Sequence, residues 1–202
     1  MSDVAAVVIG PGPDRVRGLV ARSLAEVVAV PSLAELPAAA ARVRAPLLWL
    51  LDSSATPFDG ALDALLEQGH DPAVSLPVDD SGSPAEPELG RFTESDVPGI
   101  LDAVSARRVP LRHTYVISMV VRTEAVRQQR PPDPARFGRY AGSEWTARLF
   151  ADTPGMLVPA SRVRVAPRAR GSLGHALRMA RTGVWRRGEA LRELERSVLP
   201  GR

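Results

Sequence analysis

The sequence LLWLLDSS at residues 47–54 places five apolar residues directly before a polar group. Pro46 stands in front of the run and Asp52 ends it, so the run is too short for a helix and predicts a buried strand. A strand that is apolar at every position is buried on both faces, as in the centre of a parallel sheet. The polar residues that follow such a strand lie at the sheet edge where α/β proteins bind their ligands.

The segments around this run alternate between strand-like and helix-like patterns. Strands are predicted at residues 4–9, 26–30, 47–51 and 73–76, and helices at residues 14–24, 32–43 and 57–66. Ser32-Leu33-Ala34-Glu35 opens the second of these helices with the spacing of a capping box. Alternating strands and helices predict an α/β domain whose mostly parallel sheet is flanked by helices.

The second half of the chain is less regular. Residues 77–96 are rich in Pro, Gly, Ser and acids and predict a long surface loop. Further elements are predicted as a helix at 97–104, a strand at 113–121, a helix at 143–150, short strands at 156–158 and 163–165, and a basic helical tail at 173–199 with a break near Gly183. We expect one α/β domain over residues 1–170 and a helical C-terminal extension over residues 171–202.

Composition narrows the class of protein. The chain has 202 residues, of which 45% are hydrophobic and 24% charged, as in a soluble globular domain. No apolar run approaches the ~18 residues that span a membrane, and the N-terminal region carries an acid where a secretory signal has basic residues. We expect a cytoplasmic protein, either free or at the inner membrane surface. Cysteine is absent, which excludes disulfides, thiolate metal sites and a cysteine nucleophile.

The charge is divided unevenly along the chain. Residues 1–161 hold 15 Arg and 20 acidic residues, whereas residues 162–202 hold 11 Arg and 3 acidic residues. The basic tail contains Trp185 and apolar residues at helical spacing. It therefore predicts either peripheral contact with an anionic membrane or a helix packed on the body with a solvated arginine face. A nucleic-acid partner is not expected, because the body is acidic and stacking aromatics are few.

Gly10-Pro11-Gly12 is the first candidate ligand loop, directly after the strand predicted at residues 4–9. A dinucleotide fingerprint requires a third glycine at the position where this chain has Arg15. The loop is therefore either a plain strand-to-helix turn or one wall of a ligand crevice at the carboxyl edge of the sheet.

Two carboxylates are the candidate reactive groups. Asp52 ends the central strand and has Ser53 and Ser54 as neighbours, so it either contributes to a cation or nucleotide site or caps the following turn. Glu144 stands at the start of the helix predicted at residues 143–150. It is either a general base or an acid whose place there is favoured by the positive end of the helix dipole.

Three longer segments carry a pattern in their order and spacing. LLWLLDSSATPFDGALDALL (47–66) sets an apolar strand, an aspartate motif and an apolar helix in a row, and TYVISMVVRTEAV (114–126) is a strand that runs into a helix. RFGRYAGSEWTARLFADTPGMLVPASRVRV (136–165) places Glu144, Trp145 and Arg148 at the positions of a third motif. Together the segments resemble a family-2 glycosyltransferase with the GT-A fold over roughly residues 4–166.

The resemblance implies an inverting transfer of a sugar from a nucleotide sugar to an acceptor that the sequence does not identify. It implies Glu144 as the catalytic base, because the acidic pair of the family falls here on residues 141–143, which are Ala, Gly and Ser. It also implies a donor site formed by Gly10, Pro11, Asp52, Ser54 and Arg148.

A divalent cation, Mn²⁺ or Mg²⁺, is implied at Asp52 by the same resemblance. The other two positions of the aspartate motif carry Ser53 and Ser54, so the metal site is incomplete in the sequence. Arginines such as Arg139 or Arg148 are the alternative partners of a diphosphate. Two further hypotheses keep the fold without the transfer: a non-catalytic binding or scaffold protein, and a generic nucleotide-binding protein.

Overall fold

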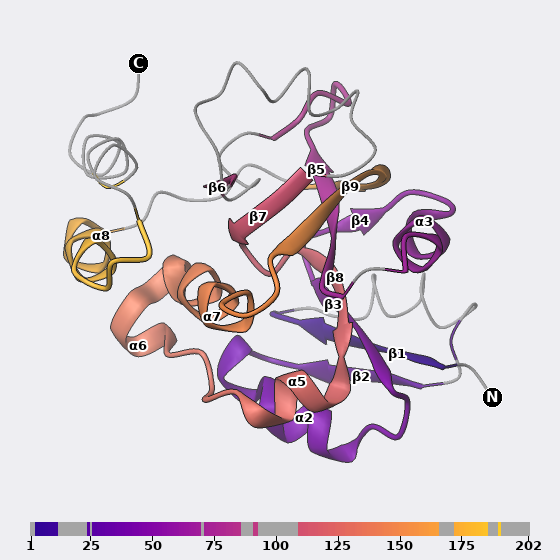
Figure 1. The fold of residues 1–202 in the computed structure, drawn as a ribbon, viewed down its shortest axis with the longest axis horizontal. Coiled ribbons are helices and arrows are strands. Elements are labelled where there is room, and N and C mark those ends of the chain that lie inside the picture. The colour runs from indigo at the N-terminus through magenta and orange to yellow at the C-terminus, as the bar shows by residue number, and fades with distance from the viewer. Residues whose placement is uncertain are drawn as a thin grey trace.

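The computed structural model describes residues 3–11, 24, 26–69, 71–85, 91–92, 109–165, 172–185 and 190. Its strands are β1 (Val4–Ile9), β2 (Val27–Val30), β3 (Leu47–Asp52), β4 (Thr56–Pro57), β5 (Ala73–Val78), β6 (Arg91–Phe92), β7 (Val109–His113), β8 (Ser118–Arg122) and β9 (Gly155–Arg164). Within the described residues they form a nine-stranded sheet in the order β2-β1-β3-β8-β5-β9-β7-β6, with β4 beside β9. Only β4, β7 and β8 of these strands run against the others, which confirms the α/β class with most strands in one direction (Figure 1).

Short helices cover both faces of this sheet. They are η1 (Leu33–Glu35), α2 (Leu36–Arg42), α3 (Ala61–Glu67), α5 (Thr123–Gln128), α6 (Pro134–Phe137), η3 (Gly138–Tyr140), α7 (Ala141–Leu149) and α8 (Leu173–Ala180). α2 and α5 pack against each other and share one core cluster with α7, whereas α3 contributes to the cluster on the opposite face (Figure 1). None of the helices among the described residues has the length and apolar character needed to span a membrane.

The central position predicted for the strand at residues 47–51 is confirmed. β3 lies between β1 and β8, pairing parallel with the first and antiparallel with the second. Leu48 and Leu50 face one core cluster, while Trp49 and Leu51 face the other. The continuous apolar run therefore reflects burial on both faces, which is the condition that requires every residue to be apolar.

The single strand predicted at residues 113–121 is wrong, because the chain breaks between His113 and Ser118 into β7 and β8. Thr146 on α7 explains the break. Its hydroxyl accepts a hydrogen bond from the backbone nitrogen of Thr114 at 2.9 Å and donates to the carbonyl oxygen of Thr114 at 2.7 Å. The buried Thr146 side chain thus satisfies the backbone N–H and C=O of Thr114. In a continuous strand these two groups would bond to a neighbouring strand instead.

The two short strands predicted at residues 156–158 and 163–165 form one strand, β9, with a bulge between them. Ser75 of β5 pairs with Val158, but the next residue, Leu76, pairs with Arg162. The intervening Ser161 is fully buried, donates a hydrogen bond to the carbonyl oxygen of Ala61 at 2.7 Å and lies 2.8 Å from the Ser75 hydroxyl. These bonds tie the bulge to α3 and allow the strand to continue.

The predicted helix at residues 32–43 is present as η1 followed by α2, but the capping box is not formed. Ser32 is the N-cap residue of η1 and makes no side-chain capping hydrogen bond. Pro37 stands in the first turn of α2, where its missing N–H removes a donor that would otherwise need a cap. The predicted helices at 14–24 and 97–104, and the tail beyond Trp185, lie outside the described residues, except Leu24 and Ala190.

The C-terminal helix packs on the body of the protein. Trp185 is 7% exposed and meets the ring of Tyr140 edge to face, with the ring centroids 5.0 Å apart. Arg178 of α8 donates a hydrogen bond to the carbonyl oxygen of Arg136 at 2.6 Å. Of the two alternatives predicted for the tail, its described part follows the packed one, because the Trp185 indole belongs to a core cluster with residues of η3, α6 and α8.

Candidate functional site

The loops after β1 and β3 meet at the carboxyl edge of the sheet. Ile9 pairs with Asp52, and the hydroxyl of Ser53 donates a hydrogen bond to the carbonyl oxygen of Pro11 at 2.9 Å. Gly10 has φ of 121°, and a Cβ at this position would lie 2.5 Å from Ser53 Oγ. The close approach of the two loops requires glycine here, so the candidate donor residues predicted in these loops lie side by side.

Asp52 is occupied by its own turn. Its Oδ1 accepts hydrogen bonds from the backbone nitrogen of Ser54 at 2.8 Å and from the Ser54 hydroxyl at 2.5 Å. This is the turn-capping role that the sequence left open beside a ligand-binding one. In the part of the chain that the structure describes, no group of three His, Cys, Asp or Glu residues could hold a metal ion. One capped carboxylate and two hydroxyls do not fit the Mn²⁺ or Mg²⁺ site that the family resemblance implied.

Glu144 is held by a guanidinium. Arg148, one helical turn further along α7, donates from Nε to Oε1 at 2.9 Å and from Nη2 to Oε2 at 3.0 Å. The side chains of Arg148 and Glu144 are 23% and 15% exposed. A parallel two-bond pair of this kind fixes the orientation of the carboxylate. The sequence suggested Arg148 as a partner for a diphosphate. In the structure its guanidinium is already bound to Glu144.

The same arginine also holds the loop before α6. Its Nη1 donates to Gln129 Oε1 at 3.3 Å and to the carbonyl oxygen of Arg130 at 3.1 Å, and its Nη2 reaches the carbonyl oxygen of Pro131 at 3.5 Å. Glu144 thus anchors an arginine that in turn positions a proline-rich loop. The other arginine suggested for the diphosphate, Arg139, lies 5.4 Å from the ring centroid of Tyr115 and 5.5 Å from that of Tyr140.

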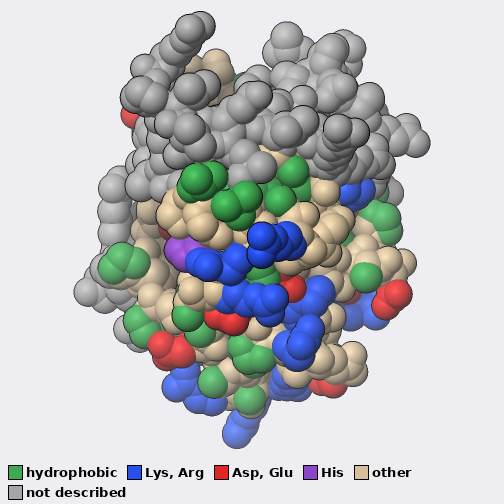
Figure 2. Space-filling model, turned by 90° about the vertical axis from the view of Figure 1, so that its left-hand side faces the viewer, with side chains coloured by type: hydrophobic (Ala, Val, Ile, Leu, Met, Phe, Trp, Pro, Cys, Tyr) green, Lys and Arg blue, Asp and Glu red, His purple; other side chains and the backbone are tan. Residues whose placement is uncertain are grey.

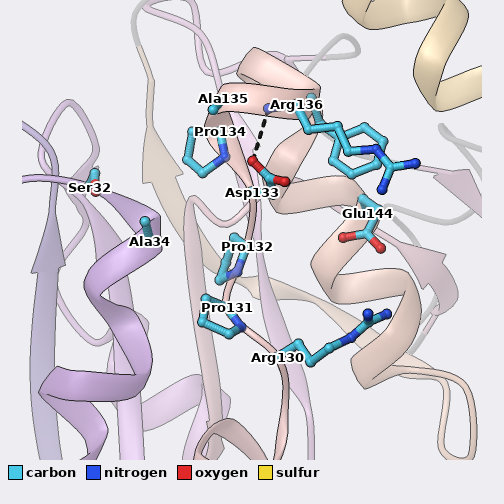
Figure 3. A pocket seen from close by; sticks show the side chains of 11 residues that line it. Ser32, Ala34, Arg130, Pro131, Pro132, Asp133, Pro134, Ala135, Arg136 and Glu144 are labelled. Atoms are coloured by element: carbon cyan, nitrogen blue, oxygen red, sulfur yellow. Dashed lines mark hydrogen bonds between the residues drawn. The ribbon is translucent and has the colours of Figure 1, made fainter.

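A pocket of about 610 Å³ opens beside Glu144 (Figure 3). On one side it is lined by Ser32 and by Ala34 of η1, two and four residues after the end of β2, and on the other by the loop at 130–133, α6 and Glu144. The volume is that of a small-molecule site. Figure 3 draws the Glu144 carboxylate between the side chains of Arg130 and Arg136, both of which line this pocket.

The structure separates the predicted site residues into two groups. Gly10, Pro11, Asp52 and Ser54 lie at the ends of β1 and β3 and are not among the residues that line the pocket, whereas Glu144 is. Arg130 and Arg136 were missed as site residues, because they belong to RQQRPPDPARFG, which shows no periodicity. The signal that could have found them is the proline-rich loop itself, since a rigid loop between two helices is a suitable place for binding residues.

Known proteins resemble this chain in fold. No family model matches it, and no curated protein matches its sequence. The crystal structure of GalNAc-T7 with UDP, GalNAc and Mn²⁺ superposes with a TM-score of 0.52 at 12% identity, over 83% of this chain and 44% of that one. The crystal structure of A197 from STIV gives 0.51 at 11% identity, over 83% and 87%. The crystal structure of S. aureus TarS 1–349 gives 0.48 at 9% identity, over 96% and 70%.

This chain spans less than half of the length of the GalNAc-T7 chain. At identities of 11% and 12% the likeness concerns the fold. The mixed sheet, its strand directions and its flanking helices are those of a GT-A-like α/β domain, as the sequence motifs predicted.

Proposed function

We propose that this protein binds a nucleotide sugar at the carboxyl edge of β1 and β3 and transfers the sugar to an acceptor that lies in the pocket beside Glu144. The observation that carries the proposal is the position of Glu144: a partly buried carboxylate of fixed orientation lines a pocket of about 610 Å³ that begins close to the end of β2. Ligands of open α/β sheets bind at this edge of the fold. The GT-A-like fold of the chain supports the same assignment.

In the proposed reaction the acceptor hydroxyl attacks the anomeric carbon of the donor sugar. The new bond forms between that oxygen and that carbon, the bond to the diphosphate oxygen breaks, and the nucleoside diphosphate leaves with its electron pair. Glu144 takes the proton of the hydroxyl, which is the work of a general base. Each of its oxygens accepts one hydrogen bond from Arg148 and keeps a second lone pair, on which the proton can be taken up.

The donor site is proposed for Gly10, Pro11, Asp52 and Ser54. The two loops are joined by the hydrogen bond from the Ser53 hydroxyl to the carbonyl oxygen of Pro11, which holds them side by side. No step is assigned to a metal ion, because the described residues do not assemble a cation site. We therefore propose a transferase that binds its donor through protein groups and not through a metal ion.

One observation favours a second function, a binding protein without transfer. Glu144 pairs with Arg148, which supports the loop at 130–131. This structural role explains the presence of the carboxylate without a catalytic function. A protein of this kind binds the nucleotide sugar and leaves it intact.

A turnover experiment separates the two functions. The protein is incubated with UDP-, GDP- and dTDP-sugars, each with and without a panel of free and phosphorylated hexoses as acceptors. Release of the nucleoside diphosphate is followed by chromatography in the wild type, in Glu144→Gln and in Glu124→Gln. Glu124 is an exposed acid on α5 and serves as the control. Release that falls 10²- to 10⁴-fold in Glu144→Gln alone supports transfer, because a general base contributes about this factor. Binding of a donor without release in any of the three proteins supports the binding protein instead.

A further inference from the structure

We infer that the acceptor is anionic, and that Arg130 and Arg136 bind a phosphate group of a phosphorylated saccharide in the Glu144 pocket. The role as acceptor rests on the proposed function. Binding of the phosphorylated saccharide itself does not, because it requires only the pocket and its two arginines.

Charge is the first observation. The pocket is lined by two acids and two arginines, but the acids already have partners. Glu144 is paired with Arg148, and Asp133 accepts a hydrogen bond from the backbone nitrogen of Arg136 at 2.9 Å as the cap of α6. Among the described residues no carboxylate pairs with the guanidinium of Arg130 or Arg136. With Glu144 neutralised by Arg148, the two arginines outweigh Asp133, the one remaining acid, and the net positive charge attracts a phosphate monoester, which carries about −1.5 to −2 at pH 7.

The position of these arginines indicates which substrate they contact. In an inverting displacement the acceptor oxygen and the leaving group lie on opposite faces of the anomeric carbon, and the base lies with the acceptor. Arg130 and Arg136 line the same pocket as Glu144, whereas Asp52 and Gly10 do not. Cations beside the base therefore contact the acceptor, and the diphosphate of the donor lies away from them.

The walls of the pocket suit a sugar ring that carries such a group. Pro131, Pro132 and Pro134 line it together with Phe137, and the Arg136 guanidinium lies 5.1 Å from the centroid of the Phe137 ring. Proline has no N–H, so at these three positions the loop offers no backbone donor to an anion and the charge must be met by side chains. Proline also fixes the loop before a ligand binds, which lowers the entropy lost on binding.

Neighbouring arginines extend the positive surface. Arg178 of α8 lies next to the pocket and donates a hydrogen bond to the carbonyl oxygen of Arg136 at 2.6 Å. Figure 2 looks onto the side of the molecule that carries α6 and α8 and shows arginine side chains gathered across the middle of this face. A guanidinium is the side chain best matched to the geometry of a phosphate.

The test measures binding by calorimetry. The ligands are hexose 1- and 6-phosphates, the matching free hexoses, inorganic phosphate, UDP, and the UDP-, GDP- and dTDP-sugars. The proteins are the wild type, Arg130→Gln/Arg136→Gln, Arg130→Lys/Arg136→Lys and a control pair, Arg42→Gln/Arg162→Gln. The control pair removes the same charge from two exposed arginines of α2 and β9 that do not line the pocket. Melting temperatures of all variants report whether each remains folded.

We expect at least one hexose phosphate to bind the wild type more tightly than inorganic phosphate does, and the free hexose not to bind. The affinity for this hexose phosphate is expected to fall tenfold or more in Arg130→Gln/Arg136→Gln and to recover in part in Arg130→Lys/Arg136→Lys. It is expected to change less than twofold in the control pair. Three results would overturn the inference: no hexose phosphate binds, the glutamine pair binds it as well as the wild type, or the control pair loses as much affinity.

The same panel separates this inference from the proposed function. Binding of a hexose phosphate with the expected dependence on Arg130 and Arg136, but of no nucleotide sugar, supports the phosphate site and refutes the transferase. Binding of a nucleotide sugar but of no hexose phosphate refutes the phosphate site and leaves the transferase standing. Loss of UDP binding in the glutamine pair, with no binding of hexose phosphates, assigns the arginines to the donor and overturns the inference.

Discussion

Asp52 and Glu144 are both carboxylates at the carboxyl edge of the fold, but the protein uses them in different ways. Asp52 accepts hydrogen bonds from Ser54, two residues further along its own turn. Glu144 holds Arg148, which also binds the backbone of the loop at 130–131 and thereby shapes the pocket. The first acid organises a turn of three residues, whereas the second, through Arg148, connects a helix to a loop that lies 17 to 18 positions before that arginine. Loss of Glu144 or of its partner should therefore disturb more of the molecule than loss of Asp52.

Arg148→Met tests the larger of the two arrangements. The variant leaves Glu144 without its partner at 15% exposure and removes the bonds to the carbonyl oxygens of Arg130 and Pro131. We expect unfolding free energy to fall by about 2–3 kcal/mol, since hydrogen bonds to charged groups contribute about 1.5–3 kcal/mol. Urea denaturation measures the change. A loss below about 0.5 kcal/mol would show that the pair behaves as an ordinary surface ion pair.

Gly10→Ala tests the turn around Asp52 from the opposite loop. A Cβ at φ of 121° would lie 2.5 Å from Ser53 Oγ, so the two loops must separate. We expect a loss of about 1–3 kcal/mol of stability, the range for a residue held in a disfavoured backbone conformation. Gly69→Ala is the matched control, because it also has positive φ but nothing within 4 Å of the added Cβ. An equal loss in both variants would mean that backbone strain alone, and not loop contact, sets the cost.

Glu144→Gln removes the charge of this partly buried acid and keeps its size. The amide retains one acceptor for Arg148 and turns its other group towards a donor, so we expect a loss of about 1–2 kcal/mol in urea denaturation. This loss should disappear when Arg148→Met is already present, because the two side chains act as one unit. Additive losses in the double variant would refute the coupling between them.

Asp52→Asn is expected to have the smallest effect on stability. An asparagine oxygen can accept both hydrogen bonds from Ser54, so the cap is preserved and the loss should stay below about 0.5 kcal/mol. Asp52→Ala removes both bonds and should cost about 1 kcal/mol. Thermal denaturation of the two variants measures the difference. If both cost the same, the negative charge of Asp52 is needed for more than the turn.

Local patterns in the sequence were sufficient to predict the central strands and the helix that carries Glu144. Continuous apolar runs predicted β1, β3 and β5, and the helix that carries Glu144 was predicted within two residues of its start. The glycine loop and the aspartate turn were placed at one edge because parallel strands end there, and the bond from Ser53 to Pro11 is consistent with this prediction. These features depend on contacts within a strand or between neighbouring strands.

Features that depend on distant side chains could not be predicted. The break between β7 and β8 depends on Thr146, which satisfies the backbone of Thr114 from 32 positions away. The pocket depends on where Arg148 places the loop at 130–131, and its segment shows no periodicity. The burial of Trp185 against Tyr140 likewise follows from tertiary packing, because a basic amphipathic pattern is equally consistent with a membrane surface.

The most direct test of the proposed donor site is a melting-temperature panel with UDP-, GDP- and dTDP-sugars, with and without Mn²⁺. The proteins are the wild type, Asp52→Ala and the control Asp59→Ala, whose acid is exposed in the loop before α3. A donor at 100 times its Kd stabilises the folded protein by about 2.7 kcal/mol. We predict that at least one donor raises the melting temperature of the wild type and of Asp59→Ala, without Mn²⁺, and that Asp52→Ala loses the shift. No shift with any donor would contradict the account.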